Sequence, residues 1–162
     1  MSFSHTKYGK LSEDIPTLLR SSIESAISNV DHGIDPSDID LLIVSNLDNQ
    51  FANQHQIGTV AWGYLGNPRA QAFRIEAACA SGGMATHVAK QMIDSGVARN
   101  ALVVGVEKMT HLSTGTATSI LIREAGPRKS TMELRSLPRT GSARSCIWRN
   151  MGRPKTTSPS LP

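Results

Sequence analysis

Two short, uninterrupted apolar runs set the strongest limit on how this chain folds. They are LLIV at residues 41–44 and ALVVGV at residues 101–106. Apolar runs of this length, without alternation, are typical of strands that are buried on both faces of a sheet. Helices must then cover both faces, so the chain should carry helical segments between its strands.

Three helical segments are predicted around these strands, at residues 12–33, 53–64 and 81–96. The first begins at Ser12 and has two acidic residues in its first turn, where the helix dipole favours them. Residues 73–77 alternate in polarity and predict one more strand. The predicted fold class is therefore α/β, and strands separated by helices of this length indicate a parallel sheet with helical cover.

One cysteine stands where the predicted strand at residues 73–77 passes into the third helix. Cys79 there faces the positive end of the helix dipole, a place that favours a thiolate. The small residues Ser81, Gly82 and Gly83 allow an acyl group to approach closely. A thiolate here can attack an acyl carbonyl while its backbone N–H holds the developing oxyanion. The alternative is that Cys79 is a small buried apolar residue, the usual role of a lone cysteine.

Two motifs around this turn resemble the thiolase superfamily. They are RIEAACASGG at residues 74–83 and VVGVEKMT at residues 103–110. The match is to acetyl-CoA acetyltransferases of the archaeal and sterol-carrier-protein thiolase type, whose N-terminal pattern also fits residues 6–11 and 33–40. The resemblance runs from about residue 5 to about residue 126 and implies an incomplete N-terminal thiolase-like domain of the α/β class, with a mixed sheet covered by helices.

The resemblance implies acyltransferase chemistry in lipid metabolism. In this family the cysteine at the Cys79 position takes an acyl group from an acyl-CoA, and a second acetyl-CoA then attacks that thioester in a Claisen condensation. The reverse reaction cleaves a 3-ketoacyl-CoA. Coenzyme A thioesters enter as substrates, and no bound cofactor or metal is implied. The resemblance also implies a homodimer or tetramer, with HMG-CoA synthase and a small zinc-ribbon/OB-fold protein as partners. Ancestry among HMG-CoA synthases or ketoacyl synthases is an alternative.

The remaining catalytic groups of that family do not occur in this sequence. The family takes its base from a Gly-His-Pro motif and adds a further cysteine and another histidine. His87 lies eight residues along the predicted helix from Cys79, a rise of about 12 Å, which is too far for a hydrogen bond. Cys146 is not assigned the second cysteine's role. The family's apolar opening strand is also expected to be missing. We therefore expect no turnover from this chain alone; a non-catalytic acyl-CoA-binding or partner-binding fragment is the alternative of another class.

Charge divides the chain into two parts, residues 1–126 and residues 127–162. The first part has 9 basic and 12 acidic residues, a balance of −3, and the second has 8 basic and 1 acidic residue, a balance of +7. The second part also contains five of the eight prolines. It predicts an irregular basic tail, which is either a nucleic-acid-binding arm, a disordered terminus or the product of another reading frame.

The reading-frame interpretation accounts for the most features of the tail. Read two bases later, codons for residues 132–138 can encode Gly-Val-Thr-Phe-Pro-Ala, and codons for residues 148–162 can encode a string that begins Ala-Glu-Tyr-Gly-Thr-Thr. Both strings resemble what thiolases carry after their Glu-Lys-Met region. We predict a frame change between about Leu121 and Ser130 and no nucleic-acid partner. Because the chain has no apolar run of membrane-spanning length and no secretory signal at its start, a cytoplasmic protein is predicted.

Overall fold

The two apolar runs form neighbouring parallel strands inside one sheet. They are β2 (Leu41–Ser45) and β4 (Asn100–Glu107), and β3 (Gln71–Ile75) pairs parallel with the other side of β2. β5 (Ser142–Arg149) runs antiparallel between β4 and β1 (Ser2–His5), which gives the strand order β1-β5-β4-β2-β3. The computed structural model describes residues 2–51, 53–124 and 142–149. The predicted α/β class with a mixed sheet is confirmed.

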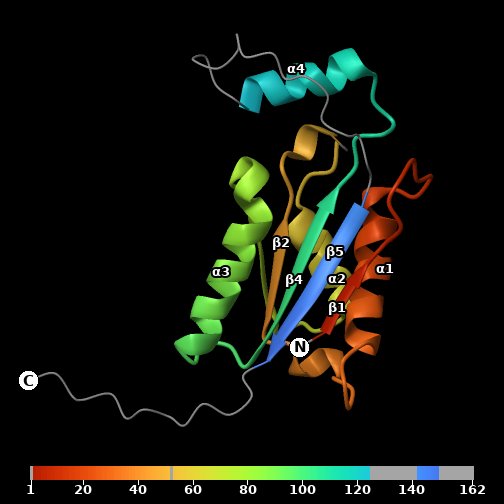
Figure 1. Ribbon diagram of the computed structural model, residues 1–162. Coiled ribbons are helices and arrows are strands. Elements are labelled where there is room, and N and C mark those ends of the chain that lie inside the picture. Colours follow the sequence, from red (N-terminus) through yellow and green to blue (C-terminus); the bar gives the residue numbers. More distant parts are fainter. Residues whose placement is uncertain (1, 52, 125–141, 150–162) are drawn as a thin grey trace, which may run out of the picture.

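Helices cover both faces of this sheet and one of its ends. In Figure 1, α1 and α2 lie on one side of the sheet, α3 lies on the other, and α4 lies beyond the carboxyl ends of the parallel strands. Short 3₁₀ turns occur in three of the loops. No helix within the described ranges is long and apolar enough to cross a bilayer. The helical bounds are α1 Ile15–Ser28, η1 Pro36–Asp38, η2 Asn49–Phe51, α2 Ile57–Leu65, η3 Ala78–Ala80, α3 Ser81–Asp94 and α4 Thr114–Glu124.

Alternate residues of β2 enter two different cores, which explains why its sequence is apolar throughout. Leu42 and Val44 pack in the cluster formed with α1 and α2. Leu41 and Ile43 pack against the small residues of α3. Because successive strand side chains point to opposite faces, a strand covered on both sides has no polar position to offer.

The first helix begins later than predicted. Asp14 is its N-cap, in an extended conformation, and its carboxylate accepts the Thr17 N–H at 2.9 Å. This hydrogen bond lowers the pKa of Asp14. Pro16 fits the first turn, where its fixed φ suits the helix and its missing N–H costs nothing. The helix also ends earlier, at Ser28, with Asn29 rather than Gly33 as its cap.

The chain does possess an opening strand, so the expectation of a missing one is wrong. Ser2–His5 forms β1. The hydroxyls of Ser2 and Ser4 point toward α1 and donate to the carbonyls of Ala26 and Ser22, at 2.8 and 3.1 Å. A strand with small polar residues on its inner face lacks the apolar signal by which strands are found in a sequence.

Part of the predicted irregular tail also belongs to the sheet. Residues 142–149 form β5 and pair with both β4 and β1. The side of β4 away from β2 would otherwise present a row of unpaired backbone groups, and strand pairing satisfies these groups with little regard to side-chain pattern. The other residues of the predicted tail, 127–141 and 150–162, lie outside the described residues.

Candidate functional site

Cys79 lies in the turn that joins β3 to α3, where the sequence predicts it. β3 ends at Ile75, the 3₁₀ turn η3 covers Ala78–Ala80, and α3 begins at Ser81. The cysteine is exposed and forms no disulfide. Its exposure excludes the alternative in which Cys79 is a buried apolar residue.

The backbone just before Cys79 adopts an unusual conformation. Ala78 has φ of 48°, in the left-handed region that residues other than glycine rarely enter. The Ser81 hydroxyl lies beside this residue, accepts the Ala77 N–H at 2.8 Å and donates to the Ala78 carbonyl at 2.7 Å. The Ala80 N–H closes the same turn on the Ala77 carbonyl at 2.9 Å. Strained backbone of this kind persists where surrounding contacts over-determine it, often at functional sites.

Open space surrounds the exposed side of this turn. Gly82 and Gly83 are exposed in the first turn of α3, and a Cβ added at either position would meet no atom within 4 Å. Met84 follows them with 44% of its surface exposed. Packing among the described residues does not require glycine at these two positions, which lie in open space in the first turn of the helix that follows Cys79.

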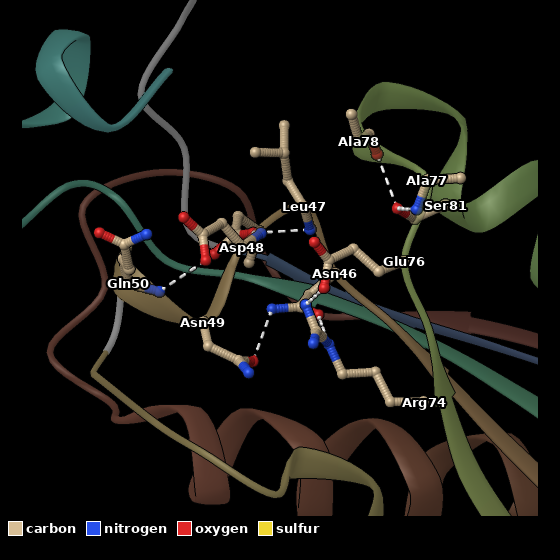
Figure 2. A network of polar contacts seen from close by, with 11 residues as sticks. Asn46, Leu47, Asp48, Asn49, Gln50, Arg74, Glu76, Ala77, Ala78 and Ser81 are labelled. Carbon is tan, nitrogen blue, oxygen red and sulfur yellow. Dashed lines mark hydrogen bonds and ion pairs between the residues drawn. The ribbon is translucent and has the colours of Figure 1, made fainter. Parts of the chain in front are cut away.

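A polar network anchors the strand that leads into the turn (Figure 2). Arg74 on β3 donates from Nε to Oδ1 of Asn46 at 2.5 Å, and its Nη2 forms an ion pair with Glu76. Asn46 directly follows β2 and is 8% exposed. The guanidinium therefore ties together the ends of two parallel strands, one of which leads into the cysteine turn.

Glu107 ties in the third parallel strand. It is the last residue of β4, and its Oε2 accepts the N–H groups of Leu47 and Asp48 at 2.9 and 3.3 Å. Its Oε1 accepts the Lys108 N–H at 3.1 Å. Burial raises the pKa of Glu107; the three backbone hydrogen bonds oppose that shift, and the nearby Asp48 carboxylate adds to it.

Residues 2–138 match the family model described as "Thiolase, N-terminal domain". The chain belongs to the thiolase family. This thiolase-family chain is 36% identical over 118 residues to the acetyl-CoA acetyltransferase of Methanocaldococcus jannaschii, a match that covers 71% of the chain and 29% of that relative. It is 37% identical over 98 residues to β-ketoacyl-[acyl-carrier-protein] synthase III 1 of Streptomyces coelicolor, which covers 60% of the chain and 28% of the relative. The chain thus spans less than a third of the length of these curated relatives.

Solved structures of the same fold include both of these kinds of enzyme. The priming β-ketosynthase of the R1128 polyketide pathway matches with a TM-score of 0.63 and 25% identity. The matched region covers 88% of the thiolase-family chain and 37% of the synthase chain. The acetyl-CoA acetyltransferase of Syntrophomonas wolfei matches with a TM-score of 0.61 and 24% identity. The matched region covers 72% of the thiolase-family chain and 31% of the acetyltransferase chain. The second likeness concerns the fold alone.

The structure does not bring a histidine to Cys79 within the part of the thiolase-family chain that it describes. His87 is exposed on α3, and no hydrogen bond joins it to the cysteine. Among the described residues no group of three His, Cys, Asp or Glu side chains could hold a metal ion. The sequence predicts Ser81 to be a small residue that leaves space for an acyl group, but its side chain is buried and hydrogen-bonded within the turn. The roles of Arg74 and Glu107 are not predicted. Arg74 and Glu107 belong to motifs quoted above, but the spacing of residues in the sequence does not indicate that both bind to the loop that follows β2.

Replacing Glu107 by Gln is expected to change how the stability of the thiolase-family chain depends on pH. Because the folded chain raises the pKa of Glu107 above 4.5, the folded state binds the proton more tightly. The wild type should therefore gain stability relative to the neutral glutamine variant as pH falls toward 4.5, and lose that gain as pH rises through the folded pKa. Urea unfolding of both proteins at a series of pH values measures the difference. A difference that stays constant, or that grows with pH, contradicts the prediction.

Proposed function

We propose that this chain accepts an acyl group from a coenzyme A thioester onto Cys79, as the first half of a thiolase-type acyl transfer. The observation that carries the proposal is the placement of Cys79. It is an exposed thiol in a strained turn, at the start of a helix and beside two open glycine positions. Membership of the thiolase family supports the same reaction class.

The proposed step exchanges one thioester for another. The Cys79 sulfur attacks the carbonyl carbon of acyl-CoA, a new C–S bond to the protein forms, and the C–S bond to coenzyme A breaks. Coenzyme A leaves as a thiolate and takes up a proton equivalent to the one lost from Cys79. While the carbon is tetrahedral, its oxygen carries negative charge, which a backbone N–H at the turn can stabilise.

Two finer assignments are open within this reaction class. We propose acetyl-CoA acetyltransferase activity for the complete protein, supported by the relative that matches over 71% of the chain. The second candidate is β-ketoacyl synthase activity, favoured by relatives of comparable identity. The carrier of the acyl group separates the two activities, because a synthase would use thioesters of an acyl carrier protein as well as thioesters of coenzyme A.

We further propose that this chain alone stops at the acyl-enzyme. The second half-reaction needs a base to deprotonate the second acetyl-CoA, and the Gly-His-Pro motif that provides it in the resembling family does not occur in this sequence. The predicted frame change accounts for its absence; genomic DNA whose shifted frame does not continue into such a motif would refute that account. Homodimerisation, the other suggested partners and a cytoplasmic location remain predictions from the resemblance.

The proposal is tested by incubating the purified 162-residue chain with acetyl-CoA and with acetyl-acyl-carrier protein. Mass spectrometry should find one added acetyl group on the peptide that contains Cys79, together with release of at most one equivalent of coenzyme A. A continuous assay of acetoacetyl-CoA thiolysis should give no turnover. Absence of the acetyl group contradicts the proposed acyl transfer, and sustained thiolysis contradicts the proposed block.

A further inference from the structure

We infer that Ser81 is a positioning residue for the acyl transfer at Cys79, because its hydroxyl fixes the orientation of the peptide group that joins Ala78 to Cys79. The inference rests on the proposed function and extends it to a residue outside the reacting atoms. Three observations carry it. They are the two hydrogen bonds of the Ser81 hydroxyl, the left-handed conformation of Ala78, and the burial of the serine.

The geometry of a trans peptide makes the first observation decisive. Its C=O and N–H lie in one plane and point in opposite directions. The Ala78 carbonyl points to the Ser81 Oγ, 2.7 Å away (Figure 2). The N–H of the same peptide belongs to Cys79, so it must point away from the serine. Ser81 is only 4% exposed and Cys79 is exposed. The serine thus directs the Cys79 N–H away from the protein interior, toward the side from which an acyl carbonyl approaches.

The left-handed conformation of Ala78 shows why such a clamp is needed. An alanine released from its contacts would leave φ of 48° for the broader allowed regions, because its Cβ crowds the neighbouring carbonyl there. Rotation of this residue would turn the following peptide with it. The Ser81 hydroxyl bonds to the residue before the strained position, at the Ala77 N–H, and to the carbonyl of the strained residue itself. The Ser81 backbone N–H also donates to the Ala78 carbonyl, but only the hydroxyl joins that carbonyl to the Ala77 N–H on the other side of Ala78.

Only a hydroxyl meets these demands in so small a space. One bond uses the oxygen as acceptor and the other uses its hydrogen as donor; alanine and valine side chains can form neither bond, and a cysteine thiol forms both only weakly. Threonine retains both functions. Glycine at position 78 removes the need for the clamp by another route, since it adopts positive φ without strain. These two substitutions allow the positioning role to be separated from a general structural role.

The test compares acetylation of Cys79 by acetyl-CoA with its alkylation by iodoacetamide in the full chain. Acetylation builds an oxyanion that the Cys79 N–H must meet, whereas alkylation builds none and depends on the accessible thiolate. S81A is expected to slow acetylation by about 100-fold while changing alkylation by less than about threefold. S81T should acetylate at close to the wild-type rate. The double variant A78G/S81A should recover a large part of the loss.

A matched control is S95A at the other end of the same helix. The Ser95 hydroxyl also donates to a backbone carbonyl, that of Met92 at 3.2 Å, and its loss should leave both rates unchanged. Equal acetylation of S81A and wild type overturns the positioning role, as does an equal fall of acetylation and alkylation. If S81A does not fold by circular dichroism, A78G/S81A decides: recovered acetylation supports the clamp and slow acetylation overturns it. A wild-type chain that is not acetylated at all overturns the proposed function itself.

Discussion

Val104→Asp is expected to unfold the protein. Val104 lies in the middle of β4, is 0% exposed and belongs to the core cluster under α1 and α2. An aspartate there buries a carboxylate among the apolar side chains of this cluster, which lowers the free energy of unfolding by about 4 kcal/mol or more. Domains of this size have a total stability of about 5–15 kcal/mol. Circular dichroism and urea unfolding should show a large loss of cooperative structure at 25 °C.

A matched control separates the buried charge from the change of side-chain type. Val97 is 60% exposed, so Val97→Asp should change the free energy of unfolding by no more than about 0.5 kcal/mol. Val104→Thr retains the shape and buries one hydroxyl, at an expected cost of about 1–3 kcal/mol. A folded Val104→Asp chain with wild-type stability would show that this face of β4 is not covered as described.

The elements with a clear apolar pattern, either an uninterrupted run or a helical period, were predictable from sequence, and the others were not. Residues 41–44 and 101–106 had to be buried strands, because no amphipathic surface element tolerates so many adjacent apolar side chains. β2 and β4 match them to within one residue at each end. β1 escaped prediction because its inner positions hold Ser2 and Ser4. Serine can be buried at these two positions because backbone carbonyls of α1 accept hydrogen bonds from both hydroxyls.

Prediction also failed where tertiary pairing overrides local sequence. The segment that forms β5 gave no strand signal, and its place between β4 and β1 follows from backbone groups that only the assembled sheet presents. α4, at residues 114–124, has a short apolar side that packs on Phe51, the last residue of η2, and on Met109 in the loop between β4 and α4. A helix of this kind is specified by its partners more than by its own period.

The candidate site shows the same division between local and long-range information. A cysteine between a strand and a helix could be placed at a turn from sequence alone, since both flanking elements have a period. The left-handed conformation of Ala78 could not, because alanine carries no preference for it. Nor could the bonds from Glu107 to the loop after β2, whose residues are about 60 positions away. Such contacts follow from topology, which places the carboxyl ends of neighbouring parallel strands together.

Replacing Cys79 by Ala is expected to abolish covalent acyl transfer to the chain. The proposed step needs a sulfur nucleophile at this position, and the methyl group of alanine offers none, so the rate of acetylation should fall on the order of 1,000-fold or more. Cys79→Ser retains size and hydrogen bonding but places a weak alcohol nucleophile in the turn. With no histidine bonded to Cys79 within the described residues, nothing there can activate the hydroxyl, and Cys79→Ser should be as inactive as Cys79→Ala.

The matched control is Cys146→Ser, which removes the other cysteine of the chain and should leave acetylation at the wild-type rate. Labelling by radioactive acetyl-CoA, followed by peptide mapping, measures all three variants.

Binding of a non-transferable CoA thioether adds a second readout. The Cys79→Ala chain should bind it with an affinity within about threefold of that of the wild type, because one exposed sulfur contributes little to the binding of so large a ligand. Label that survives Cys79→Ala, or that moves to Cys146 in the wild type, would show that the turn between β3 and α3 presents no nucleophile. Binding without any label would leave the chain as a non-catalytic acyl-CoA-binding fragment.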